Sequence, residues 1–154
     1  MSKKRLALTI ILSLLIAFLI SLIFLHSSKT GSESVKYSDK FLSVPDKFMG
    51  LFGIEATRDT LSYIVRKSAH FLEYFALSAL LSGLIYTLTL KPKRIFIAPP
   101  SALFIAIIDE FVIQRQTFGR SAEIKDVIID LFGGLISAVI FALILLRKSK
   151  RSRK

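Results

Sequence analysis

Apolar residues along this chain fall into four long blocks separated by short polar segments. The first block, 6–25, contains only Leu, Ile, Phe, Ala, Thr and Ser. A helix of that length reaches about 30 Å, the thickness of the hydrocarbon core of a bilayer. Three further blocks, at about 65–90, 95–113 and 124–146, are also long enough to cross. The pattern predicts an all-α bundle of four transmembrane helices.

Lys3, Lys4 and Arg5 precede the first block, so a cleaved signal peptide is the alternative to a first span. The apolar region is longer than the roughly 7 to 15 residues of such a peptide, and no small-x-small cleavage site follows it. We therefore expect a retained first helix.

Basic residues mark one side of the membrane. Segments 1–5, 91–94 and 147–154 hold twelve of the 22 Lys and Arg residues and none of the 11 acidic residues. Because cytoplasmic segments are enriched in Lys and Arg, both termini are expected in the cytoplasm of a multi-pass plasma-membrane protein. We expect one membrane domain, 1–146, followed by a basic cytoplasmic tail, 147–154.

The basic residues flank spans and lack the aromatic platform or helix-turn-helix pattern of a nucleic-acid-binding protein, so no nucleic-acid partner is expected. The chain has no cysteine, which excludes disulfides and thiolate metal sites. The sequence identifies no cofactor, and it leaves oligomerisation open.

The segment between the first two blocks, 26–64, is rich in Ser, Lys and acidic residues. Part of it is too apolar for free solution, and we expect an interfacial segment resting on the outer leaflet or on the bundle. Its apolar residues are Phe41, Leu42, Val44, Phe48, Met49, Leu51, Phe52 and Ile54. In the third block, Pro99-Pro100 is expected to break or kink the helix.

Six ionisable residues lie within or at the edges of the later three blocks. Each costs roughly 2.5 to 3.5 kcal/mol at the centre of a membrane helix, so function is sought among them. They are His70, Glu73, Asp109, Glu110, Asp126 and Asp130.

Helical spacing groups these residues with polar neighbours. Lys67, His70 and Tyr74 share one helix face, with Glu73 on its flank; Glu110 and Gln114 are four residues apart, as are Asp126 and Asp130. The predicted directions of the three helices bring all these groups to the outer half of the membrane. The expectation is one outward-facing polar pocket. Its ten candidate residues are Lys67, His70, Glu73, Tyr74, Asp109, Glu110, Gln114, Arg120, Asp126 and Asp130.

Arg120, in the connection before the last span, is expected to pair with nearby carboxylates or to bind an anion together with Lys67. Gly133 with Ser137, and Gly134 with Ala138, form small-xxx-small pairs that predict close helix packing. His26, alone at the end of the first span, is interpreted as an interface residue.

Several of these motifs together resemble the VanZ-like family of small integral membrane proteins. They are residues 67–74 (Lys-Ser-Ala-His-Phe-Leu-Glu-Tyr) with Leu77, then Asp109-Glu110 with a following Gln, then Gly119-Arg120, then Asp126, Asp130 and Gly133. The family pattern usually has His-Gln soon after Asp-Glu and a Pro before Gly-Arg, where this chain has Ile113-Gln114 and Phe118. The family's named member is linked to resistance to the glycopeptide teicoplanin, which implies a role at the cell envelope.

Four functional hypotheses follow. The first is a protein whose outer pocket binds a lipid-linked cell-wall precursor or a phospholipid, with Lys67 and Arg120 contacting the anionic head group. The second is a hydrolase or transferase using the histidine and carboxylates as acid and base, or as ligands of a hard divalent cation. The third is a purely structural polar core. A proton-coupled transporter is disfavoured, since four helices without an inverted repeat would have to work as an oligomer.

Overall fold

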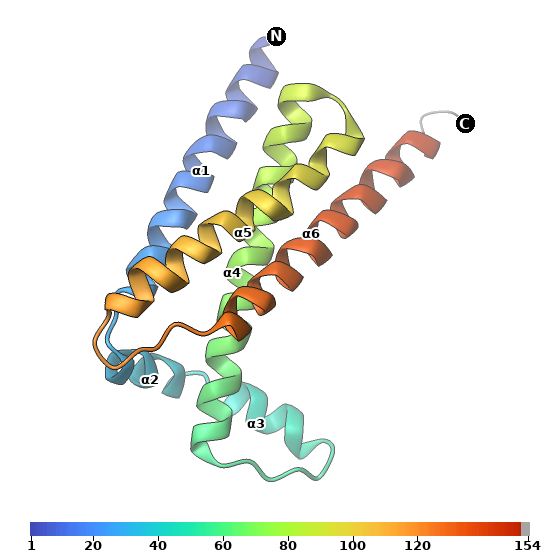
Figure 1. Cartoon of the computed structure of the whole chain (residues 1–154). Helices are drawn as coiled ribbons and strands as arrows, with labels where there is room; N and C mark the ends of the chain where they lie inside the picture. Colours follow the sequence, from blue (N-terminus) through green and yellow to red (C-terminus); the bar gives the residue numbers. More distant parts are fainter. Residues whose placement is uncertain (152–154) are drawn as a thin grey trace.

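The computed structural model describes residues 1–151, which fold into helices and connecting turns (Figure 1). Four helical stretches are long and apolar enough to cross a membrane: Lys3–Ser27, Arg58–Thr89, Pro92–Gln116 and Ile124–Arg151. This confirms the predicted all-α bundle with four transmembrane helices.

Three of these stretches are continuous α-helices: α1 (Lys3–Ser27), α4 (Arg58–Thr89) and α6 (Ile124–Arg151). The other stretch is composite. A 3-10 turn, η1 (Pro92–Ile97), leads into α5 (Ala98–Ile108), which continues through a π-helical turn, η2 (Asp109–Ile113), and a 3-10 turn, η3 (Gln114–Gln116). Two short helices, α2 (Gly31–Asp39) and α3 (Ser43–Gly50), fold the segment between α1 and α4.

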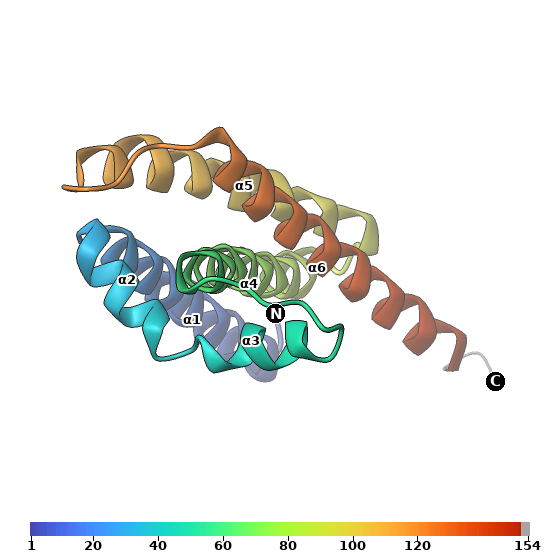
Figure 2. The ribbon, with the colours of Figure 1, turned by 90° about the horizontal axis from the view of Figure 1, so that it is seen from below.

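Helix α4 is the central element and packs against α1, α5 and α6. Seen along its axis in Figure 2, it lies between α1 on one side and the α5–α6 pair on the other. The buried apolar cluster includes Ile16 and Ile23 of α1, Leu77 of α4, and Ala102 and Ala106 of α5. Large apolar side chains on the outside of the bundle, such as those of Leu14, Phe18 and Phe104, are exposed, which suits contact with lipid tails.

Small residues set the contact between α4 and α6. A Cβ atom on Gly133 would lie 2.5 Å from the carbonyl oxygen of Phe71, so the two backbones meet there directly. Two turns further along α4, Ser78 Oγ donates a hydrogen bond of 2.8 Å to the carbonyl oxygen of Gly134. The glycine pair therefore packs helix on helix, as its spacing predicted.

The starts of two helices, α4 and α5, depend on local features other than hydrophobicity. Helix α4 begins at Arg58, two turns before the predicted start near residue 65, because Thr57 caps it by accepting a hydrogen bond from the Thr60 amide. In the third stretch, Pro99 and Pro100 lie in the first turn of α5, where proline removes no helical hydrogen bond. The expected break in the helix at these prolines is observed, since the chain changes there from a 3-10 to an α-helical form.

The N-terminus, the turn between α4 and η1, and the end of α6 share one end of the bundle (Figure 1). Arg5 links the start of α1 to the end of α4, because its Nε and Nη2 atoms donate to the carbonyl oxygens of Thr87 and Leu88 at 2.9 and 3.0 Å. The predicted basic segments thus lie together, and α6 continues without interruption to Arg151. Residues 152–154 of the predicted tail lie outside the described part of the chain. That this end faces the cytoplasm stays a prediction from charge.

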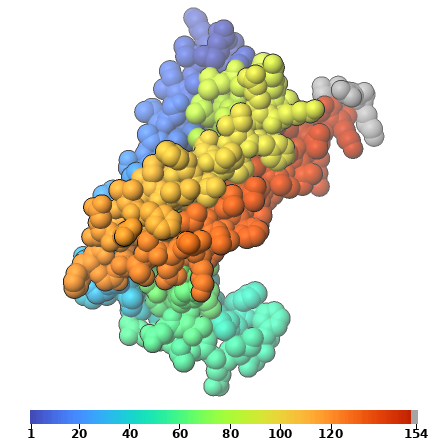
Figure 3. Space-filling model, in the orientation of Figure 1, coloured from blue at the N-terminus to red at the C-terminus, as the bar shows by residue number. Residues whose placement is uncertain are grey.

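Helices α2 and α3 lie at the opposite end, where the segment around α3 and the start of α4 protrudes from the bundle (Figure 3). Ser62 Oγ of α4 donates to Ser38 Oγ of α2 at 3.2 Å, and Arg58 pairs with Asp39. The apolar side chains predicted to be interfacial are largely exposed, among them Phe48 and Leu51 at 64% and 81%. Their contact with a membrane surface stays a prediction.

Candidate functional site

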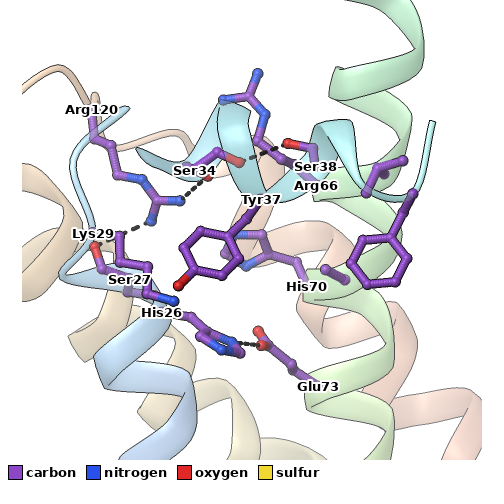
Figure 4. A pocket seen from close by; sticks show the side chains of 13 residues that line it. His26, Ser27, Lys29, Ser34, Tyr37, Ser38, Arg66, His70, Glu73 and Arg120 are labelled. Carbon is purple, nitrogen blue, oxygen red and sulfur yellow. Dashed lines mark hydrogen bonds and ion pairs between the residues drawn. The ribbon is translucent and has the colours of Figure 1, made fainter. Parts of the chain in front are cut away.

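A cavity of about 370 Å³ lies between the end of α1, helix α2, helix α4 and the connection to α6 (Figure 4). It combines cationic, hydroxyl, imidazole and apolar side chains. The lining residues are His26, Ser27, Lys29, Ser34, Tyr37, Ser38, Phe41, Val65, Arg66, Ala69, His70, Glu73 and Arg120.

A close glycine contact lies next to Arg120 in the sequence. The Gly31 amide, at the start of α2, donates to the Phe118 carbonyl oxygen at 3.1 Å, and Gly119 has a left-handed φ of 74°. A Cβ atom on Gly31 would lie 2.2 Å from the Gly119 carbonyl oxygen. Only a residue without a side chain fits at position 31, and this close approach holds the connection against α2.

Arg120 reaches from that connection into the cavity. Its Nη1 atom donates to the Ser27 carbonyl oxygen at 3.2 Å and to Gln114 Oε1 at 3.0 Å, while Nη2 donates to Ser34 Oγ at 2.8 Å. All three acceptors are neutral. The expected pairing with a carboxylate is therefore not observed, since Arg120 has no ion-pair partner within 4 Å in residues 1–151. Burial lowers the pKa of Arg120 from its ordinary value, and nearby Asp109 opposes that shift.

Two further cations line the cavity. Arg66 of α4 has a buried Nε atom that meets no acceptor within the described chain, and its guanidinium takes part in no ion pair there. Lys29 places its Nζ atom 3.6 Å from the centre of the Tyr37 ring, a cation–π contact. Neither residue was among the predicted site residues, because a single Arg or Lys near the end of a span ordinarily serves as a topology signal.

Both histidines of the chain line this cavity, each beside a carboxylate from another helix. His26 Nδ1 of α1 lies 2.9 Å from Glu73 Oε1 of α4, as Figure 4 shows. His70 Nδ1 of α4 lies 3.5 Å from Asp130 Oδ1 of α6, an ion-pair distance without hydrogen-bond geometry. His26 is therefore not alone, as the sequence had suggested, while its location at the membrane interface stays a prediction. No local pattern links positions 26 and 73, so only the packing of α1 on α4 reveals the pair.

Asp109, Glu110 and Gln114 form a buried network behind the cavity. Gln114 Nε2 donates to Glu110 Oε2 at 2.6 Å and to Asp109 Oδ2 at 3.2 Å. In a regular α-helix, positions 109 and 114 would lie about 140° apart; the π-helical turn η2 brings them to one side. Ser27 Oγ of α1 also donates to Asp109 Oδ2, at 2.8 Å.

Glu110 extends this network to the start of α6. Its Oε1 atom accepts a hydrogen bond of 2.6 Å from the Glu123 amide, one residue before the helix begins. A carboxylate at a helix N-terminus satisfies an amide that has no partner within the helix and interacts favourably with the helix dipole. The network thus joins α1, η2 and α6.

Lys67 points to a different part of the surface. It pairs with Asp126 and lies 3.5 Å from Glu123 Oε2, and its Nζ atom is 4.9 Å from the Tyr63 ring centre. Lys67 lines a shallow depression with Tyr63 and Ser68 rather than the cavity of Arg120. The expectation that Lys67 and Arg120 contact one anion is corrected, because the pair with Asp126 turns Lys67 toward α6.

Four of the predicted residues are almost fully enclosed, with exposures of 2% or less: Tyr74, Asp109, Glu110 and Asp130. The Tyr74 hydroxyl, both Asp130 carboxylate oxygens and Asp109 Oδ1 have no hydrogen-bond partner in the described residues. Of the ten predicted residues, His70, Glu73 and Arg120 line the cavity, and the other seven lie behind or beside it. Within residues 1–151, no three His, Asp or Glu side chains gather closely enough to hold a metal ion.

The model of the VanZ/LLP1 family matches residues 12–146. The chain belongs to the VanZ/LLP1 family. Its matched range includes all four spans in large part, all ten predicted site residues and both histidines. Comparison with curated proteins and with solved structures found no match for this VanZ/LLP1 protein.

Proposed function

We propose that this VanZ/LLP1 protein binds the phosphate-bearing head group of an envelope lipid in the cavity between α1, α2 and α4. The proposal rests on the charge of the side chains that line this cavity. Lys29, Arg66 and Arg120 face one carboxylate, Glu73, which His26 already contacts. Guanidinium groups match the geometry of phosphate oxygens, and a cation withdrawn from water without an anionic partner is costly. A bound phosphate supplies that partner.

The apolar part of the lining favours a lipid over a free anion. Phe41, Val65 and Ala69 join the polar residues, and Phe41 is 57% exposed. The exposed apolar residues of α3 follow it directly along the chain. A lipid fits this arrangement, because its head group takes the polar lining while its first methylene groups contact the apolar residues. Ser34, Tyr37 and Ser38 provide hydroxyl groups for the remaining polar atoms of the head group.

The side of the membrane on which this cavity opens follows from the charge distribution. The cavity lies at the end of the bundle opposite the three basic segments, among α2, the end of α1 and the early turns of α4. If those segments face the cytoplasm, the cavity opens toward the outer leaflet of the plasma membrane. We therefore propose an outer-leaflet lipid or a lipid-linked cell-wall precursor as the ligand.

The test compares Arg66→Gln with Arg115→Gln. Arg66 lines the cavity, whereas Arg115 is exposed on η3 and outside it. Each protein is reconstituted in nanodiscs of phosphatidylglycerol and phosphatidylcholine, and retained lipid is measured by native mass spectrometry. A charge-assisted hydrogen bond contributes about 1.5 to 3 kcal/mol, so Arg66→Gln is expected to weaken phosphatidylglycerol retention by about 10-fold or more. Arg115→Gln should retain as much as the wild type. Equal retention by all three proteins, or a preference for neither lipid, contradicts the proposal.

An effect on glycopeptide susceptibility is proposed on the family resemblance, whose named member is linked to teicoplanin resistance. Capture of an envelope lipid would change the surface to which the antibiotic has access. Expression of the wild type in a teicoplanin-sensitive bacterium is expected to raise the inhibitory concentration, and Arg66→Gln should abolish the increase while Arg115→Gln preserves it. An unchanged inhibitory concentration with wild-type protein in the membrane rejects this effect.

The Asp109, Glu110 and Gln114 network favours a structural role for those three residues. They are buried, bonded to one another and to Ser27 and Glu123, and absent from the cavity lining. Substitution there should reduce the amount of folded protein, whereas substitution of Arg66 should reduce lipid retention at unchanged yield.

A further inference from the structure

The placement of the two histidines extends the proposed function from binding to chemistry. The chain of 154 residues contains only His26 and His70, and both line the cavity with the three cations. They come from different helices, α1 and α4, and are far apart in the sequence. Figure 4 shows both imidazole rings in the cavity region, with the ring of Tyr37 close by.

Each imidazole has a carboxylate beside it, hydrogen-bonded in the case of His26 and at ion-pair distance in the case of His70. The Nδ1 atom faces a carboxylate, Glu73 for His26 and Asp130 for His70, at 2.9 and 3.5 Å. Neither Nε2 atom forms a hydrogen bond within the described residues. His70 Nε2 is not among the fully buried atoms that lack a partner, so it is not fully buried. A carboxylate close to the ring stabilises the imidazolium that forms when Nε2 accepts a proton. For His26, the hydrogen bond to Glu73 also holds the proton on Nδ1 and leaves the Nε2 lone pair available.

We propose that His26 and His70 are a general acid–base pair that cleaves a phosphodiester in the bound head group. The proposal rests on lipid binding in the cavity. Two imidazoles facing one cationic cavity can remove a proton from the attacking oxygen and deliver one to the leaving oxygen, while Arg66 and Arg120 stabilise the charge on the phosphate oxygens.

The nucleophile is water. Ser27 Oγ donates to Asp109, Ser34 Oγ accepts from Arg120, and Ser38 Oγ donates to the Ser34 carbonyl oxygen, so each cavity serine is engaged. One neutral histidine takes a proton from water as the water oxygen bonds to phosphorus. The bond from phosphorus to the leaving oxygen breaks, and the other, protonated histidine donates its proton to that oxygen. The products are a phosphomonoester and an alcohol, and exchange of one proton with solvent restores both histidines.

The experiment follows hydrolysis and binding in the same samples. Full-length protein carrying an affinity tag without histidine is reconstituted with phosphatidylglycerol, phosphatidylethanolamine or cardiolipin. Phosphodiester and phosphomonoester are resolved by ³¹P NMR, and retained lipid is measured by native mass spectrometry. General acid–base catalysis contributes about 10²- to 10⁴-fold, so His26→Gln and His70→Gln are each expected to slow monoester formation by about 100-fold or more while retaining lipid. Arg115→Gln serves as the control and should match the wild type.

The outcomes separate the two proposals. Wild-type protein that retains these lipids but leaves them intact overturns the acid–base pair and leaves lipid binding standing. Wild-type protein that retains none of them overturns both. Hydrolysis that survives in His26→Gln or His70→Gln overturns the pair. Glycerophosphoglycerol is tested in parallel, and its hydrolysis at the rate of phosphatidylglycerol would overturn a lipid substrate in favour of a free phosphodiester.

A measurement on the wild type covers the case in which a variant fails to fold. Diethyl pyrocarbonate modifies histidines, and peptide mass spectrometry reports each of the two sites separately. Modification of either site is expected to abolish hydrolysis, and bound phosphatidylglycerol should protect both sites. Full hydrolysis by doubly modified protein overturns the proposal.

Discussion

Gly133 of α6 lies against the backbone of Phe71 in α4, so closely that a Cβ atom would come within 2.5 Å of the Phe71 carbonyl oxygen. The next glycine is different, because a Cβ atom on Gly134 would meet Ser78 Cβ at 3.6 Å, an ordinary contact. There is thus no room for a methyl group at Gly133, whereas a methyl group fits at Gly134. Gly133 sets the spacing at which the His70–Asp130 pair forms between these helices.

Gly133→Ala is expected to destabilise the protein by about 1 to 3 kcal/mol, since the added methyl group must push α4 and α6 apart. Gly134→Ala is the matched control and should cause no loss of stability. Thermal unfolding of the purified proteins in one detergent measures the difference. Equal stability of the two variants would show that α4 and α6 do not approach as described.

Gln114→Ala removes a donor from two buried carboxylates and an acceptor from Arg120. Leaving a buried polar group without its partner costs about 1 to 3 kcal/mol, and a loss of stability in that range is expected. Gln116, two residues along and exposed, supplies the control variant Gln116→Ala. The comparison uses folded yield and unfolding temperature. A Gln114→Ala protein as stable as the control would argue against the network around Asp109.

Gly31→Ala tests the contact that holds the connection before α6 against α2. The added methyl group would lie 2.2 Å from the Gly119 carbonyl oxygen, whereas a methyl group on Gly50 would meet nothing within 4 Å. Gly31→Ala is therefore expected to destabilise this contact by roughly 0.5 to 3 kcal/mol and to open the connection, and Gly50→Ala is expected to be neutral. Trypsin cleavage after Arg120 should be faster in Gly31→Ala alone. Identical cleavage of both variants would contradict the contact.

The chain contains no cysteine, so single introduced cysteines report the topology without a background signal. Glu55→Cys lies in the connection between α3 and α4, Ser2→Cys lies just before α1, and Ser149→Cys lies in the last turns of α6. A membrane-impermeant maleimide added to intact cells is expected to label position 55 and to leave 2 and 149 unlabelled until the cells are opened. The reverse pattern would place the cavity on the cytoplasmic side.

Much of this architecture is predictable from the sequence because lipid imposes a strong constraint. A helix must satisfy its own backbone groups in a bilayer, so 20 consecutive apolar residues lead directly to a span. The spacing of Glu110 with Gln114, of Asp126 with Asp130, and of Gly133 with Ser137 likewise follows from the helical repeat. These relationships are local, since one helix brings both residues to the same side.

The sequence by itself therefore determined the four-helix bundle, the family motifs and the identity of the polar residues within the spans. Only the tertiary structure decided which of those residues meet. It turns Lys67 toward Asp126, places Arg66 and Lys29 in the cavity, and joins His26 to Glu73. The physical reason is that contacts between helices depend on their crossing, rotation and separation. A π-helical turn at Asp109–Ile113, and glycine contacts at Gly133 and Gly31, change those quantities in ways that the spacing of residues along one helix does not encode.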